Sequence, residues 1–210
     1  MPSFQTILGF IFVLYLHGAY ANPPLVPIET LKPKPEHHKA TQLINHVLKN
    51  YHYKTAPLDD ELSKAVLERY IAALDPARSY FLQSDINGFN EHVEQIDDYL
   101  RRSNLEPMFN IFINFRKRVK QRVNYALKIL DSNFDFSVSE TIDFERETAA
   151  WAQHKDGLNE LWRKRVKNDI LSLRLGGKNT KDLTGTLRER YAGLFRRTAQ
   201  LNSEDVFETF

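Results

Sequence analysis

Apolar residues recur at helical spacing along most of the chain. In the first such segment Leu43, Ile44, Val47, Leu48 and Tyr51 fall at i, i+1, i+4, i+5 and i+8, which places them on one stripe of a helix. Equivalent stripes predict helices over residues 59–74, 84–100, 105–130, 158–173 and 180–199, and the start of one more at 203–210. The pattern therefore predicts an all-α, multi-helix domain whose helices bury their apolar stripes.

Residues typical of helix ends stand at the borders of these segments. We expect Ser84 and Thr180 as N-caps, because a hydroxyl oxygen can accept a free backbone N–H of the first turn. Asp75–Pro76 ends the second helix, since the residue before a proline disfavours the α conformation. Gly176–Gly177 supplies a left-handed C-terminal cap for the helix that precedes it.

One segment, around residues 133–153, departs from the helical pattern. Phe134, Phe136 and Val138 alternate with polar residues, as the residues of a strand do. The sequence therefore predicts a short hairpin or an irregular ordered segment at this point.

The first residues have the pattern of a secretion signal. Ile7–Leu16 is an apolar run too short for a permanent membrane span, and Ala19 and Ala21 occupy the two small positions that a signal peptidase reads. We predict a signal peptide over 1–21, cleavage after Ala21, and a periplasmic protein. No Lys or Arg precedes the apolar run, so an uncleaved inner-membrane anchor stays open as the alternative. Residues 22–37 hold five prolines and predict an extended leader.

Composition narrows the function classes. The chain has no cysteine, which excludes disulfides, thiolate nucleophiles and cysteine-ligated zinc. Its formal net charge of +2 is nearly balanced and gives no overall attraction to nucleic acid. A hydrophobic fraction of 42% is that of an ordinary folded domain. We therefore expect a globular protein that folds by core packing and binds no nucleic acid.

No residue pattern points to catalysis or to a cofactor. Ser63 and Lys64 are neighbours on a predicted helix and so point in different directions, and Ser172 has no lysine at helical reach. The histidines at 37, 38, 46 and 52 lack an acidic partner at i+4 spacing. We expect no catalytic residue, no metal site and no cofactor.

A basic run, RKRVKQR at 116–122, stands out within the long helix. The ordinary interpretation of such a run is a solvated helix face. A docking face for an acidic partner protein, made by Arg116, Lys117 and Lys120, is the other interpretation.

Four stretches carry a family resemblance: LDPARSYFL at 74–82, DILSLRL at 169–175, RERY at 188–191 and QLNSEDVF at 200–207. In these the chain resembles the tail-specific proteases, periplasmic members of the C-terminal-processing peptidase family (S41 family). The similarity runs roughly from residue 38 to 210. It implies that 38–202 is the N-terminal helical domain of such a protease and that 203–210 begins a helix that is cut short.

The resemblance implies that the parent enzyme is a serine endopeptidase that processes proteins from apolar C-terminal tails. Its PDZ domain and Ser-Lys protease domain would follow this region, and no catalytic residue can be carried over to this chain. The helical part of such enzymes frames the substrate entrance and offers a surface to an adaptor lipoprotein. A free-standing periplasmic binding or adaptor module is the alternative. We also expect exposed apolar surface on the unfinished last helix.

Overall fold

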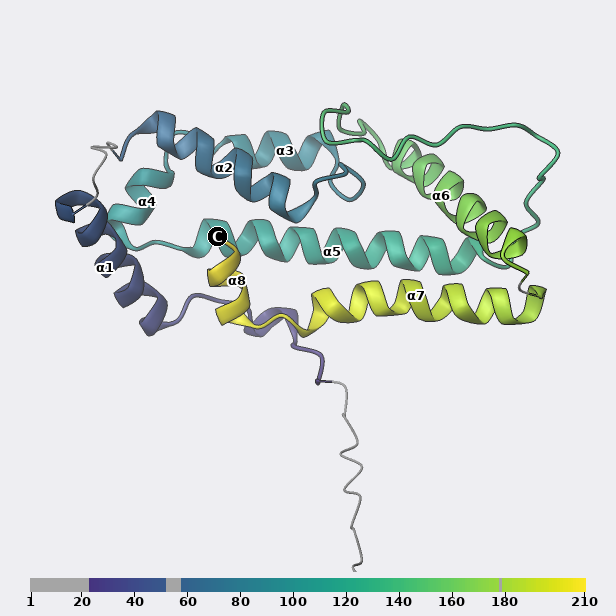
Figure 1. The fold of residues 1–210 in the computed structure, drawn as a ribbon. Helices are drawn as coiled ribbons and strands as arrows, with labels where there is room; N and C mark the ends of the chain where they lie inside the picture. Colours follow the sequence, from purple (N-terminus) through teal and green to yellow (C-terminus); the bar gives the residue numbers. More distant parts are fainter. Residues whose placement is uncertain (1–22, 52–57, 178) are drawn as a thin grey trace, which may run out of the picture.

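The structure is a computed structural model that describes residues 23–51, 58–177 and 179–210. These residues form helices and no strand, apart from one isolated bridge between Leu82 and Ala152, so the all-α prediction is confirmed. A short 3-10 helix covers Ile28–Thr30. The α-helices are α1 (Pro35–Tyr51), α2 (Asp60–Leu74), α3 (Gln83–Asn90), α4 (Ile96–Arg102), α5 (Glu106–Ile129), α6 (Lys155–Leu175), α7 (Thr180–Gln200) and α8 (Ser203–Thr209) (Figure 1).

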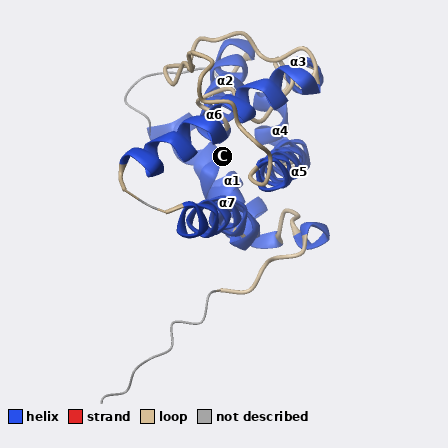
Figure 2. Cartoon of the chain, turned by 90° about the vertical axis from the view of Figure 1, so that its right-hand side faces the viewer, coloured by secondary structure: helices blue, strands red, loops and turns tan. Residues whose placement is uncertain are grey.

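The long helix α5 runs through the middle of the molecule and belongs to two hydrophobic cores. Its first half packs with α2, α3, α4 and α8 around buried residues such as Leu67 and Phe81. Its second half packs with α6 and α7 around Trp162 and Leu187; Figure 2 shows α5 and α7 nearly end-on and α6 running obliquely to them. Phe115 packs against both cores. A single amphipathic helix therefore joins the two halves of the domain.

The segment predicted as one helix over 84–100 is two helices, and its predicted N-cap is wrong. The Asp85 carboxylate accepts the Leu82 N–H at 2.9 Å, so α3 starts at Gln83 with Leu82, not Ser84, at the N-cap position. The hydroxyl of Ser63 accepts the N–H of Asp97 at 2.9 Å and satisfies a first-turn donor of α4. Similarly, Asn179 rather than Thr180 caps α7.

The motif at 74–82 forms a tight turn built around one buried carboxylate. Asp75 is 1% exposed and accepts the backbone N–H groups of Ser79, Tyr80 and Phe81 at 2.8, 2.8 and 2.9 Å. Burial raises the pKa of Asp75, and these hydrogen bonds oppose that rise. The indole of Trp162 donates to the Ser79 carbonyl at 2.8 Å. The turn thus fixes the end of α2 to α6.

The predicted leader over 22–37 is packed against the helices over 23–34, and its last residues, 35–37, belong to helix α1. The Val26 N–H donates to the Ala199 carbonyl at 2.8 Å, and the Gln200 side chain donates to the Pro23 carbonyl at 2.8 Å. Leu31 is buried in the first core. Helix α1 then begins at Pro35, earlier than the apolar pattern indicates, because proline is well suited to the first turn of a helix.

The short last helix is packed, contrary to the expected exposed apolar surface. Val206 is 1% exposed, and Phe207 stacks on the His37 ring with centroids 4.7 Å apart. Phe210 meets the Tyr70 ring edge-on at 5.4 Å. Asn202 caps the helix by accepting the Glu204 and Asp205 N–H groups. Tertiary contacts therefore stabilise a helix too short to persist alone.

Candidate docking surfaces

The structure separates the three residues of the predicted basic docking face. Lys117 and Lys120 are exposed on α5. Arg116 is only 6% exposed, and its guanidinium donates to the carbonyl of Val26 in the leader. Arg116 therefore holds the leader against α5, and only the two lysines present charge to solvent.

Two further arginines of the basic run are also used inside the fold. Arg118 forms two hydrogen bonds of 2.8 Å with the Asp85 carboxylate of α3. Arg122 is 1% exposed and donates to the Asn159 side chain of α6 at 2.7 Å. Burial lowers the pKa of Arg116 and of Arg122. The arginines of the run thus connect α5 to three other segments, which the run of charges alone did not reveal.

Helix α1 exposes the apolar stripe that the sequence identified. Leu43, Ile44, Val47 and Leu48 are 64%, 51%, 45% and 38% exposed, and we call them the α1 apolar face. The helix is attached through polar side chains instead: those of His38 and Asn45 donate to carbonyls of Ser103 and Leu100. The stripe predicted the helix correctly, but the expectation that it is buried is wrong within this chain.

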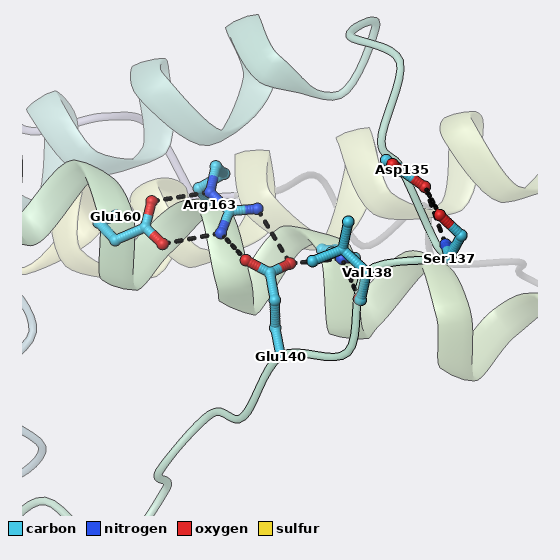
Figure 3. A network of polar contacts seen from close by, with 7 residues as sticks. Asp135, Ser137, Val138, Glu140, Glu160 and Arg163 are labelled. Atoms are coloured by element: carbon cyan, nitrogen blue, oxygen red, sulfur yellow. Dashed lines mark hydrogen bonds and ion pairs between the residues drawn. The ribbon is translucent and has the colours of Figure 1, made fainter.

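The segment predicted as a hairpin or irregular loop is irregular and is held on α6 by an ion-pair network (Figure 3). Glu140 accepts hydrogen bonds from Arg163 and Lys167, and Arg163 also binds Glu160 at 2.7 Å. Lys167 donates as well to the Val138 carbonyl at 3.1 Å. These contacts leave a groove of about 240 Å³ between the segment and α6.

This network predicts a pH-dependent attachment of the segment. Hydrogen bonds from Arg163 and Lys167 lower the pKa of Glu140 from 4.5 to about 2. Because the folded-state pKa is depressed, the stabilising contribution is present above about pH 4.5 and is lost as the pH falls through about 2. Backbone NMR chemical shifts of residues 136–142 should therefore change in that window. The variant Glu140→Gln should lack this step, whereas a Glu140 carboxyl that titrates near 4.5 by NMR would contradict the prediction.

The candidate nucleophiles are placed as helix residues. Ser63 is buried and its hydroxyl donates to Asp97 at 2.9 Å, while its neighbour Lys64 is exposed. Ser172 is exposed on α6. Among the described residues, neither hydroxyl forms a hydrogen bond with a lysine or a histidine that could act as its base.

The histidines are likewise not gathered. His37 is buried and bonds Glu204 at 2.9 Å, while His38 bonds a carbonyl. Within 23–51, 58–177 and 179–210, no three His, Asp or Glu side chains are grouped to hold a metal ion. His52 and the predicted cleavage residues Ala19 and Ala21 lie outside the described residues. Among the described helices, none has both the length and the apolarity needed to cross a bilayer.

Comparison with known proteins identifies the family of this chain. A family model described as "Tail specific protease N-terminal domain" matches residues 44–210. A tail-specific protease of Haemophilus influenzae is 33% identical over 199 residues, which is 90% of this chain and 29% of that relative. The chain thus spans less than a third of the relative's length, and it belongs to the family of tail-specific protease N-terminal domains.

Proposed function

We propose that this chain is the non-catalytic N-terminal scaffold of a periplasmic tail-specific protease. In this proposal the PDZ and Ser-Lys protease parts belong to the remainder of the full-length enzyme, which cleaves proteins presenting apolar C-terminal tails. The helical domain positions those parts, limits which substrates reach them and offers a surface to an adaptor protein. The predicted signal peptide, cleaved after Ala21, and the absence of cysteine favour the periplasm as its location.

The α1 apolar face is the observation that carries this proposal. An amphipathic surface helix of a globular protein turns its apolar stripe inward and its polar side outward. Helix α1 does the reverse, since Thr41 and Asn45 lie on its attached side while Leu43 and Val47 face solvent. A contiguous exposed apolar face indicates a contact with another polypeptide surface. In a domain taken from a longer protease, that surface is provided by the remainder of the enzyme.

The substitution Val47→Asp tests this proposal. In the chain alone, Val47 is 45% exposed, so the free energy of unfolding should change by no more than about 0.5 kcal/mol. In the full-length protease a carboxylate would be buried against an apolar surface, and peptide cleavage should fall by about tenfold or more.

Leu175→Asp is the matched control, since Leu175 is an 82% exposed apolar residue on α6. It should leave both the unfolding and the cleavage rate unchanged. Wild-type cleavage by the Val47→Asp full-length enzyme would overturn the scaffold proposal. Cleavage of the same peptide by the isolated chain would overturn its non-catalytic role.

A further inference from the structure

The groove between residues 136–142 and α6, which we call the loop groove, has the lining of a binding site. Its walls combine apolar side chains with lysines, an asparagine and backbone of the irregular segment. Phe136 is fixed in place because the Arg174 guanidinium lies 4.3 Å from its ring centroid. Val138 on the segment and Leu171 on α6 both line the groove, and they are 53% and 40% exposed, so a ligand can reach them.

The charges around the loop groove do not cancel. Among the residues that line the groove, Glu140 is the carboxylate, whereas Lys164 and Lys167 are the cations. Lys167 pairs with Glu140, and Lys164 interacts with Glu160 without a hydrogen bond, so the lining itself carries a net positive charge. Lys164 is the half-buried cation that forms no hydrogen bond within the described residues, and it lines the groove.

Further hydrogen-bonding groups beside this lysine are also unused. The side chain of Asn168, one helical turn after Lys164, is half-buried and forms no hydrogen bond to any described residue. The backbone N–H groups of residues 139–142 find no acceptor in the described part of the chain. These donors are accessible at the groove and can therefore hydrogen-bond a ligand rich in acceptors.

The size of the loop groove restricts what can occupy it. Its volume of about 240 Å³ is below the roughly 300–1,000 Å³ of small-molecule sites. A helix with its side chains is about 10–12 Å across and would need a wider trough. A short stretch of non-helical peptide fits better, since its side chains can enter the groove while its carbonyls meet free N–H groups.

Together the geometry points to the loop groove as a docking site for an unstructured segment of a partner protein, in which branched apolar residues are followed by Asp or Glu. The apolar side chains pack between Val138 and Leu171. The carboxylate accepts hydrogen bonds from Lys164 and Asn168. The Glu140 network holds the irregular segment on α6, so the groove exists before the peptide binds. This site is distinct from the α1 apolar face and does not depend on the scaffold proposal.

A fluorescein-labelled peptide, GSGLVEGSGS with an amidated end, is the probe for this site. Titration into the isotopically labelled chain should shift backbone NMR signals of residues 136–142 and 164–171 and leave those of α1 unchanged. Replacing Glu by Gln in the peptide should weaken binding, followed by fluorescence anisotropy, by about fivefold to tenfold. Replacing Leu-Val by Ser-Ser should abolish it.

Variants of the chain assign the contacts. Lys164→Gln should weaken binding of the Glu peptide about fivefold and leave binding of the Gln peptide unchanged. The change in the chain and the change in the peptide each remove the same interaction. Leu171→Glu should abolish binding of both peptides. The control Lys117→Gln, at an exposed lysine on α5, should alter neither.

Three outcomes would overturn the assignment. The first is the absence of shifts at 136–142 and 164–171 with about 1 mM peptide. The second is equal binding of the Glu and Gln peptides. The third is tighter binding of GSGSGLV with a free C-terminal carboxylate than of the internal sequence, which would assign the groove to chain ends. Failure here would leave the Val47→Asp result unaffected, so the two proposals are judged separately.

Discussion

Replacing Trp162 by alanine is expected to destabilise the chain by about 3–5 kcal/mol, the usual cost of removing a large aromatic side chain from a core. Trp162 is 0% exposed, packs beside Tyr191 and Tyr80, and donates to the Ser79 carbonyl. The substitution leaves a cavity in the second core and removes the hydrogen-bond donor of that carbonyl. Domains are stable by only about 5–15 kcal/mol, so this is a large fraction of the total.

Urea unfolding followed by circular dichroism measures the loss of unfolding free energy in Trp162→Ala, and thermal unfolding measures the change in melting temperature. The melting temperature should fall by about 10 °C, given about 2–4 °C per kcal/mol for a domain of this size. Trp151 provides the matched control because it is only partly buried, beneath the Arg78 guanidinium. Trp151→Ala should cost about 1–2 kcal/mol. Equal losses for the two variants would contradict the role of Trp162 in joining α6 to the turn.

The second large effect is expected for Asp75→Ala, at about 3–4 kcal/mol. The substitution deprives the N–H groups of Ser79, Tyr80 and Phe81 of their acceptor, and an unsatisfied buried donor costs about 1–3 kcal/mol. Burial raises the pKa of Asp75, which shows that desolvation opposes part of the hydrogen-bond energy. The expected loss of stability is therefore smaller than the cost of three unsatisfied buried N–H groups added together.

Asp75→Asn separates the hydrogen bonds from the charge. Its single side-chain oxygen still accepts N–H groups, so we expect roughly half of the alanine effect by the same urea measurement. The exposed carboxylate of Asp131, which pairs with Arg188, is the control, and Asp131→Ala should cost below about 1 kcal/mol. If Asp75→Ala were as mild as Asp131→Ala, the carboxylate would not organise the turn.

The sequence predicted most helices because their stripes are local features. The spacing of Leu67 and Ile71, and of Val119 and Val123, identifies α2 and α5 and also the side that each buries. Helix boundaries were less predictable. The division between α3 and α4 depends on Ser63, whose hydroxyl accepts the Asp97 N–H from 34 positions away. Local patterns contain no information about such a distant acceptor.

The candidate surfaces were harder to predict than the fold, for two physical reasons. The basic run on α5 appears solvated in the sequence, but the partners of Arg116 and Arg118 are 90 and 33 positions away. Likewise, Glu140 finds Arg163 across 23 positions. The stripe of α1 shows that the helix is amphipathic, but it does not reveal whether the apolar side contacts this chain or another surface.

The accessibility of Val47 in the chain and in the full-length protease is the most direct test of the scaffold account. The chain has no cysteine, so Val47→Cys introduces its single thiol, and the rate of maleimide labelling at residue 47, followed by peptide mass spectrometry in both proteins, reports its exposure. Leu175→Cys provides the reference rate for an exposed position on α6. We predict labelling of Val47→Cys close to that reference in the chain alone, and about tenfold or more slower in the full-length enzyme. Equal labelling rates in the two proteins would contradict the claim that the remainder of the protease covers this face.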